Sequence, residues 1–261
     1  MHTVYNRIYK YHGGIMGNMI EINSDIKNTG AYEALPKAEP KGAVIVIHEV
    51  WGLADHIKSI ADRFANEGYV ALAPNLLDSI NASSEEIAQL QKDLFDDQKR
   101  SLVQPQLRKL MAPIQEPEFG KLTTDRLKDC FNYLYSRPEA KQKIAVTGFC
   151  FGGTYSFSLA VAEPRLILAL PFYGHADQAV EELKSIKCPI RAFFGQNDEA
   201  LISKLPDLES RMSEAGIDFK AKVYQGCGHA FFNDTNPITY NEVAAQDSWQ
   251  IVLSELQKTT E

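Results

Sequence analysis

The strongest constraint on the fold of this chain is a repeated alternation of short apolar runs with helical segments. The run Ala43–Ile47 and the run YVALAP at 69–74 are apolar along their length, which is typical of parallel strands buried on both faces. Segments of helical periodicity connect such runs and predict right-handed crossovers. The sequence therefore predicts an α/β protein with a mostly parallel central sheet and helices on both faces.

The same alternation locates the expected elements. Strands are expected at 43–47, 69–74, 143–147, 166–172, 190–194 and 220–224, and helices at 57–67, 123–136, 151–162, 203–216 and 240–257. No repeat, low-complexity stretch or linker divides the chain, so residues 1–261 are expected to form one domain.

Two segments lie outside this alternation. Residues 1–40 form a polar lead-in, whose short β-like stretches at 19–23 and 31–35 suit an edge hairpin. Residues 78–120 are polar and helical. We expect this helical excursion to cover the edge of the sheet and the substrate site.

Composition narrows the classes of function. The 261 residues are 44% hydrophobic, which is enough for one sizeable core. The net charge is −7 and the chain has no Lys/Arg-rich run, so we expect no binding to nucleic acid. The first residues lack the apolar core of a signal peptide, and no run of about 18 apolar residues occurs. We therefore expect a cytoplasmic protein that does not bind membranes.

The four cysteines are too sparse for a disulfide scaffold and form no CxxC pair. Zinc sites in proteins use tighter clusters of ligands. We therefore expect neither a metal nor a cofactor. Each cysteine has to be judged by its own surroundings: Cys130, Cys150, Cys188 and Cys227.

The motif GFCFGG at 148–153 carries the most specific chemical signal. It lies between a predicted strand and a predicted apolar helix, where the pattern glycine, x, nucleophile, x, glycine is typical of a nucleophile elbow. Such a turn strains the backbone of the nucleophile, and its glycines allow neighbouring backbones to approach closely. Free N–H groups at the start of the helix would stabilise a negative charge on Cys150. A buried structural cysteine is the usual alternative, but the elbow favours a nucleophile.

A general base and an acid are predicted on two later loops. His229 follows the strand 220–224 in GCGHAFF, and Asp198 follows the strand 190–194 in FFGQND. His175 also follows a strand, but it precedes Asp198, and triads of this kind run in the order nucleophile, acid, histidine. We therefore predict that Asp198 orients His229, which takes the thiol proton of Cys150. Among the other histidines, we expect one packed at a strand end, His48, and three in solvent, His2, His12 and His56.

The loop HEVWGL at 48–53 follows the first long strand and supplies a fourth element. Oxyanion holes at such elbows combine the N–H after the nucleophile, here Phe151, with one N–H from this loop. Val50 is the candidate in the loop. Two interpretations of Glu49 stay open: a solvated loop acid, or a group that holds or shuttles the thiol proton.

Together these motifs resemble the dienelactone hydrolases (carboxymethylenebutenolidases), a family of the α/β-hydrolase superfamily. The matching stretches run in order from about Lys41 to the C-terminus: HEVWGL, GYVALAPNLL, GFCFGG, FYG, GQND and GCGHAFF. The resemblance implies the α/β-hydrolase fold and a triad of Cys150, Asp198 and His229. It also implies that Glu49 contacts the resting thiol and helps to form the thiolate when substrate displaces it, with Val50 and Phe151 as the oxyanion hole.

Two departures from the family concern the substrate. The family uses arginines for the substrate carboxylate, one placed four residues after the catalytic histidine and one shortly after the APNLL-like strand end. Here the first place holds Asn233, and LLDSIN has no arginine at the second. Cations that could substitute lie in the excursion: Lys99, Arg100 and Arg108. Residues expected to contact substrate are Trp51, Phe231 and Asn233.

The leading hypothesis is hydrolysis of a small ester or lactone through a thioester acyl-enzyme on Cys150. A broader carboxylesterase or thioesterase is an alternative within the same class. A non-hydrolytic binding protein that uses Cys150 as a redox-sensitive thiol is an alternative from another class. The expected partner is a small-molecule substrate, and the expected state is a monomer or a small homo-oligomer.

Overall fold

A computed structural model describes residues 17–78, 84–94 and 98–260. Within them the strands are β1 (Asn18–Ile22), β2 (Thr29–Ala34), β3 (Ala43–Ile47), β4 (Val70–Pro74), β5 (Ile144–Phe149), β6 (Leu168–Phe172), β7 (Ile190–Gly195) and β8 (Phe219–Tyr224). These eight strands of the described chain form one sheet in the order β1-β2-β4-β3-β5-β6-β7-β8. β2 pairs antiparallel with both β1 and β4, and the pairings from β4 to β8 are parallel.

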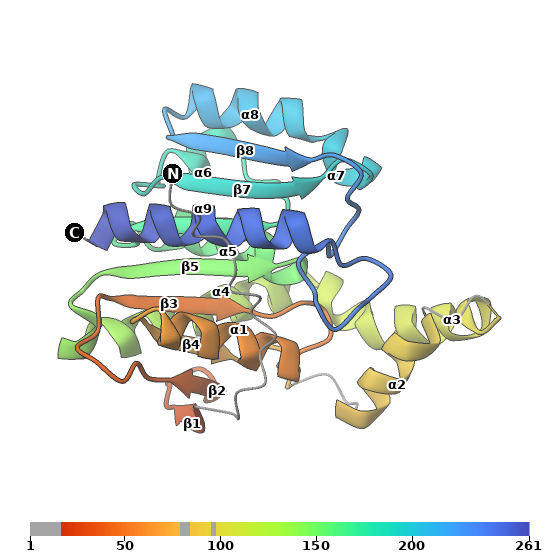
Figure 1. Cartoon of the computed structure of the whole chain (residues 1–261), viewed down its shortest axis with the longest axis horizontal. Coiled ribbons are helices and arrows are strands. Elements are labelled where there is room, and N and C mark those ends of the chain that lie inside the picture. The colour runs from red at the N-terminus through yellow and green to blue at the C-terminus, as the bar shows by residue number, and fades with distance from the viewer. Residues whose placement is uncertain (1–16, 79–83, 95–97, 261) are drawn as a thin grey trace, which may run out of the picture.

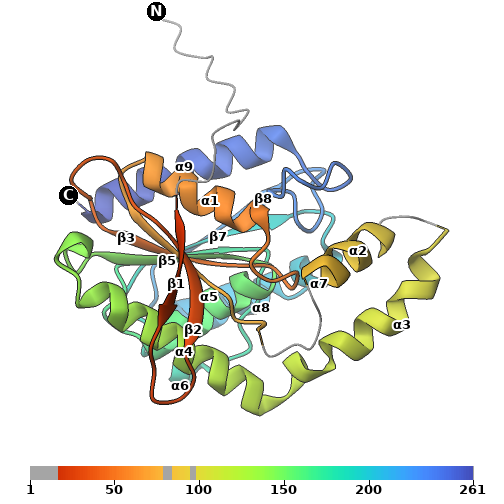
Figure 2. The ribbon, with the colours of Figure 1, turned by 90° about the horizontal axis from the view of Figure 1, so that it is seen from below.

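Helices cover both faces of the sheet (Figures 1 and 2). The main ones are α1 (Asp55–Asn66), α4 (Pro117–Tyr135), α5 (Phe151–Ala162), α8 (Leu205–Glu214) and α9 (Glu242–Thr260), with the short α6 (Val180–Leu183), α7 (Glu199–Ile202) and η2 (Pro138–Ala140). α1 and α9 pack in the core on one face, and α4, α5 and α8 pack in the core on the other. Among the described residues, no helix is both long enough and apolar enough to cross a bilayer.

The predicted α/β architecture with a mostly parallel sheet is confirmed. The hairpin expected at 19–23 and 31–35 is β1 paired with β2, in the register Met19↔Tyr32. The largest shift in a boundary is at α4, which begins at Pro117 and not at 123, because proline suits the first turn of a helix, where its missing N–H is not needed.

The excursion at 78–120 contains α2 (Ser84–Leu94), α3 (Arg100–Met111), η1 (Ala112–Gln115) and the start of α4. The expectation that it covers the edge of the sheet is wrong, because α2 and α3 do not lie along β1 or β8, the strands at the two edges. Instead, α2 and α3 project beyond the carboxyl ends of the parallel strands (Figures 1 and 2). Residues 79–83 and 95–97 of this segment lie outside the described residues.

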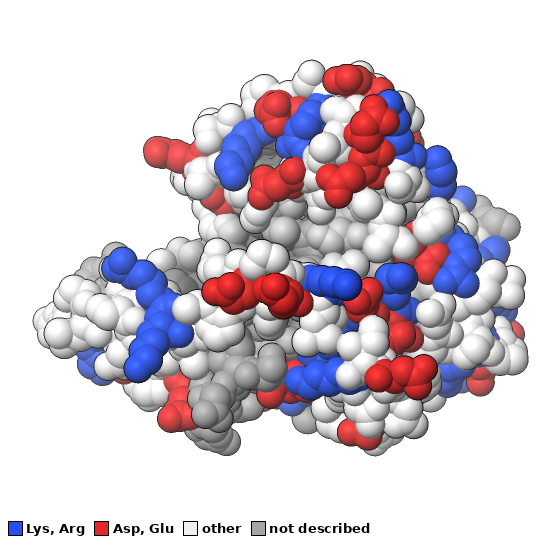
Figure 3. Space-filling view, turned by 180° about the vertical axis from the view of Figure 1, so that it is seen from behind, with Lys and Arg blue, Asp and Glu red and all other residues white. Residues whose placement is uncertain are grey.

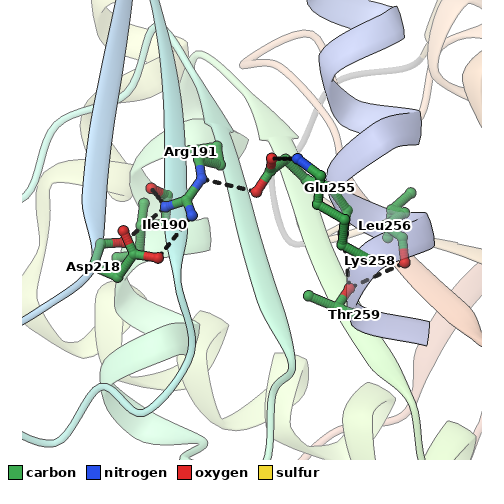
Figure 4. Close-up of polar contacts among 7 residues, drawn as sticks. All are labelled: Ile190, Arg191, Asp218, Glu255, Leu256, Lys258 and Thr259. Carbon is green, nitrogen blue, oxygen red and sulfur yellow. Dashed lines mark hydrogen bonds and ion pairs between the residues drawn. The ribbon is translucent and has the colours of Figure 1, made fainter. Parts of the chain in front are cut away.

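A polar cluster ties α9 to the start of β7 (Figure 4). Arg191, which is 9% exposed, donates from Nε to Glu255 (2.9 Å) and from Nη2 to Asp218 (2.7 Å). Its Nη1 donates to the backbone carbonyls of Ile190 and Asp218. The guanidinium therefore links a helix, a strand and the turn before β8 at the end of the sheet opposite α2 and α3.

Candidate active site

Cys150 lies in the turn between β5 and α5, in a conformation that few residues other than glycine adopt (φ 57°, ψ −111°). A Cβ on Gly148 would lie 2.1 Å from the carbonyl oxygen of Gly152, and a Cβ on Gly152 would lie 2.2 Å from that of Ile47. The N–H of Cys150 donates to the carbonyl of Phe172 on β6 (3.1 Å). The turn therefore has the geometry expected of a nucleophile elbow and holds the half-buried Cys150 at the carboxyl end of the sheet.

His229 and Asp198 are brought together from two loops, after β8 and β7. Nδ1 of His229 lies 2.5 Å from Oδ2 of Asp198, and the two side chains are 42% and 10% exposed. An ionised carboxyl group only accepts hydrogen bonds, so Nδ1 carries the hydrogen and Nε2 is free for the thiol. Burial lowers the pKa of His229, but the hydrogen bonds to Asp198 and Cys150 outweigh burial and raise this pKa to about 10.

Glu49 is buried (4% exposed), so the interpretation as a solvated loop acid is wrong. Its Oε2 accepts a hydrogen bond from Nδ2 of Asn233 (2.7 Å). Its Oε1 has no hydrogen-bond partner among the described residues, so this structure shows no hydrogen bond from Oε1 to the Cys150 thiol. Burial raises the pKa of the Glu49 carboxyl, and the charge of His56 and the Asn233 hydrogen bond oppose this shift.

Neither expected oxyanion donor gives its N–H to a backbone carbonyl of the described residues. Phe151 is the first residue of α5, where helix geometry leaves the N–H without an acceptor. Within the described chain, no backbone carbonyl accepts from the N–H of Val50. Both residues line the same cavity as Cys150.

His48 holds the loop that carries Val50, and it is fully buried, as predicted. Its Nε2 accepts from the N–H of Leu76 (3.0 Å), so its Nδ1 carries the hydrogen and donates to the carbonyl of Glu49 (2.7 Å). Its ring stacks on Phe151 with centroids 5.5 Å apart. Burial lowers the pKa of His48 to about 4, which keeps the ring neutral.

A cavity of about 680 Å³ opens in front of Cys150 and His229. Figure 3 shows the surface hollowed between the upper part of the molecule and the projecting arm of α2 and α3. Segments from η1, α4, α5, α7 and the loop after β6 form the walls. The apolar or aromatic wall residues are Val50, Ile114, Phe151, Tyr155, Tyr173 and Leu201.

Comparison with known proteins identifies the chain. Residues 29–260 match the sequence model of the dienelactone hydrolase family. This chain belongs to that family. A protein of Saccharolobus solfataricus assigned as a carboxymethylenebutenolidase is 36% identical over 94% of this chain and 100% of its own length. Protein usf of Aquifex pyrophilus is 35% identical over 92% of this chain and 97% of its own.

Solved structures agree on the fold of this dienelactone hydrolase family member. The crystal structure of a protein from Klebsiella pneumoniae, assigned as a dienelactone hydrolase, has a TM-score of 0.77 and 24% identity, and it covers 94% of this chain and 99% of the other. Family membership makes the chain a dienelactone hydrolase-like enzyme of the carboxylic ester hydrolase class.

The three residues expected to contact substrate in this dienelactone hydrolase-like enzyme lie elsewhere. Phe231 has no exposed surface and packs in the core, 5.5 Å from the ring of Tyr173. Asn233 is 3% exposed and holds Glu49. Trp51 is half-buried and is not among the residues that line the cavity. Closeness in sequence to Glu49 or His229 does not determine which way these side chains point.

The structure brings other residues to the cavity of this family member. Thr154, Tyr155 and Tyr173 line it, from α5 and the loop after β6. His175, the alternative base, lines it as well, but its Nδ1 lies 3.1 Å from Oγ1 of Thr154 and its Nε2 lies 3.1 Å from Oδ2 of Asp177. One sequence signal pointed to this wall: the stretch FYGH comes at the carboxyl end of a predicted strand, where reactive loops of a parallel sheet lie.

Two of the three cations proposed to replace the family's arginines lie away from the cavity. Lys99 pairs with Asp93 (2.8 Å), and neither Lys99 nor Arg108 lines the cavity. The side chain of Arg100 lies outside the described part. Among the described residues, the one lysine or arginine in the cavity wall is Lys121 on α4.

The other cysteines of this hydrolase are buried in the core, unlike Cys150. Burial raises the pKa of Cys130 and Cys188 to about 12 and also raises that of Cys227. No group of three or more His, Cys, Asp or Glu side chains in the described chain is arranged to hold a metal ion.

Proposed function

We propose that this chain hydrolyses a small ester or lactone by forming a thioester on Cys150. The observation that carries the proposal is the Asp198–His229 pair, which faces a cysteine at a strained elbow in front of a cavity of about 680 Å³. Of the cysteines that the structure describes, the other three are buried in the core. The elbow therefore carries the thiol suited to nucleophilic attack.

In the proposed mechanism, His229 takes the proton of the Cys150 thiol, and the sulfur attacks the ester carbonyl. The N–H groups of Val50 and Phe151 stabilise the negative oxygen that forms. His229 then gives its proton to the leaving oxygen, and a thioester is left on Cys150. Water, deprotonated by His229, attacks this thioester, and the acid product and the thiol are released. Asp198 keeps the ring oriented throughout.

The substrate class follows from the cavity and from the relatives. The relatives assigned as carboxymethylenebutenolidases support a lactone or ester. The largely apolar wall favours an uncharged or weakly polar acyl group, with Lys121 as the charge available to an anionic substituent. A broader carboxylesterase or thioesterase uses the same chemistry and is distinguished only by its preferred substrate.

The test compares wild-type protein with Cys150→Ala on p-nitrophenyl acetate and a panel of lactones and thioesters. We expect Cys150→Ala to lose at least about a thousandfold in kcat/KM, because no other group can form the acyl-enzyme. Cys188→Ala is the matched control, since Cys188 is also a cysteine but is buried away from the cavity. Equal turnover by wild type and Cys150→Ala would reject the proposal.

Mass spectrometry separates the enzyme from a redox-sensing protein. Substrate-dependent acylation of Cys150 supports the hydrolase. Peroxide-dependent sulfenylation of Cys150 without any turnover would support the sensor instead.

A further inference from the structure

A second cavity, of about 290 Å³, lies beside the cavity in front of Cys150. Its walls come from the loop after β6, from β7 and α7, and from α8. Two residues line both cavities, His175 and Leu201. Sites that hold a whole small molecule start at about 300 Å³. The second cavity therefore has room for part of a substrate whose remainder lies in the first.

The partition between the two cavities belongs to the segments that carry the candidate triad. Leu201 lies on α7, directly after Asp198, and its N–H donates to the carbonyl of Asp198 (3.1 Å). His175 lies in the loop after β6, and its ring contacts Thr154, four residues after Cys150 on α5. A substrate group that passes this partition therefore starts close to the reacting atoms.

Hydrogen bonds hold the ring of His175 in place. Its Nε2 lies 3.1 Å from Oδ2 of Asp177, and an ionised carboxyl group only accepts, so Nε2 carries the hydrogen. Nδ1 then accepts from the hydroxyl group of Thr154 (3.1 Å), whose oxygen accepts from the backbone N–H of His175 (3.3 Å). Both ring nitrogens are bonded, so His175 forms a fixed part of the partition.

The buried lining of the second cavity is apolar. The buried residues among those that line it are Gly174, Ala176, Phe194, Leu205 and Leu208. Burial of apolar surface is favourable in proportion to the area that is removed from water. This lining therefore favours a hydrocarbon group.

The charged residues of the second cavity are paired with one another. Arg211 donates from Nε to Asp207 (2.8 Å), and Nζ of Lys204 lies 4.0 Å from Oδ1 of Asp177. Arg211 also donates to two backbone carbonyls of the loop after β6 (2.8 Å each). Because each cation on this wall has an anion beside it, neither sign of charge is left over to select an ionic group.

We propose that the second cavity binds an uncharged hydrocarbon chain of the substrate, while the reacting carbonyl lies at Cys150 in the first cavity. This inference rests on the proposed function and narrows its substrate class to esters and lactones that carry such a chain. The chain belongs either to the acyl group or to the alcohol of the ester. No bond forms or breaks in the second cavity.

A larger side chain in the apolar lining tests the proposal with acyl chains. Leu208→Phe enlarges the lining from α8, and p-nitrophenyl acetate and hexanoate differ only in the acyl chain. We expect the ratio of kcat/KM for hexanoate to that for acetate to fall at least about tenfold, because the longer chain loses its space. The ratio cancels a general loss of activity. Ala176→Leu, from the loop after β6, serves if Leu208→Phe does not fold.

Ethyl acetate and hexyl acetate provide the same comparison for the alcohol chain. A fall of the ratio in one series alone identifies which chain the second cavity holds. Met212→Phe is the matched control, since Met212 is a fully buried residue of α8 that does not line either cavity. Its ratios should equal those of wild type in both series.

Alkylation of Cys150 gives a readout that needs no turnover. Iodoacetamide and N-hexyl iodoacetamide both react by displacement of iodide by the thiolate, and mass spectrometry follows each rate. We expect the ratio of the N-hexyl rate to the unsubstituted rate to fall in Leu208→Phe and to stay unchanged in Met212→Phe.

Unchanged ratios for Leu208→Phe and Ala176→Leu in both ester series would overturn the inference, and so would an equal fall in Met212→Phe. Failure of the proposed function is a separate result, seen as equal turnover by wild type and Cys150→Ala. In that case the alkylation ratio decides, and equal values in wild type and Leu208→Phe overturn the inference.

Discussion

Backbone strain is concentrated around the thiol. Five non-glycine residues of the described chain have positive φ, and three of them are Cys150 (57°), Tyr173 (37°) and Ala230 (62°). Cys150 is the proposed nucleophile, Tyr173 lines the cavity, and Ala230 follows His229. Such conformations cost about 1–3 kcal/mol each and persist only where the surrounding structure imposes them. The surroundings of these three residues therefore hold the backbone of the candidate site in a fixed geometry at a cost in folding stability.

The pKa of His229 leads to a prediction about stability and pH. The folded-state pKa is raised from 6.5 to about 10, so the charged ring stabilises the fold fully below pH 6.5 and loses this effect as pH rises through about 10. Wild type should therefore exceed His229→Gln in stability by a margin that shrinks over this range. Urea unfolding at about pH 6, 8 and 10 measures that margin. A margin that grows with pH would contradict the assignment.

At the scale of elements, the junction of β5 and α5 requires close backbone approach. Gly148→Ala would place a methyl group 2.1 Å from the carbonyl oxygen of Gly152. We expect a loss of about 2–3 kcal/mol in unfolding free energy, together with loss of activity, because the elbow has to shift. Gly30→Ala on β2 is the control, since nothing lies within 4 Å of its added Cβ. Equal unfolding free energies for the two variants would show that the elbow tolerates the methyl group.

Arg191 attaches α9 to the sheet through the polar contacts drawn in Figure 4, so its loss should lower the stability of the fold. Arg191→Met should lower the unfolding free energy by about 2–3 kcal/mol, because two carbonyls and two carboxylates lose a buried donor. Lys222→Met, which removes a pair with Asp247 whose side chains are 44% and 46% exposed, should cost less than about 1 kcal/mol. Chemical denaturation of both variants tests this difference, and a larger loss for Lys222→Met would refute it.

At the scale of the whole molecule, one buried cation joins the lead-in, the sheet and the cavity wall. Arg126 of α4 is 1% exposed. It donates to Thr29 of β2, to the carbonyls of Asn75 and Leu76 after β4, and to Asp78. α4 also supplies Lys121 and Thr124 to the cavity. Arg126 therefore holds this wall of the cavity in place against the sheet.

Arg126→Met should therefore lower the unfolding free energy by about 3 kcal/mol and raise KM more than it lowers kcat. The proposed triad has no residue on α4, so alkylation of Cys150 by iodoacetamide should change little. Lys128→Met, on the opposite side of the same helix, is the control. A fall in kcat with KM unchanged would show instead that the proposed triad depends on α4. Steady-state kinetics with p-nitrophenyl acetate distinguishes the two outcomes.

The sequence by itself determined the order of the main strands and helices, and it named candidate reactive residues at the strand ends. Short, fully apolar runs are typical of strands buried on both faces, and a glycine-flanked cysteine between a strand and a helix is typical of a nucleophile elbow. Cys150, Asp198 and His229 could therefore be named as candidates for a triad before the fold was known. Family membership could be recognised for the same reason, because these motifs are local and ordered along the chain.

Tertiary structure alone decided how the neighbours of these residues are oriented. Phe231 and Asn233 follow His229 closely, yet the first packs in the core and the second binds Glu49. His56 follows the exposed Asp55 and was expected in solvent, yet it is buried against Asp234, far along the chain. Sequence patterns report which face of an element is apolar, whereas pairings between distant loops depend on how the strands are ordered in the sheet. The environment of Glu49 could be seen only once β3, α1 and the loop after β8 were brought together.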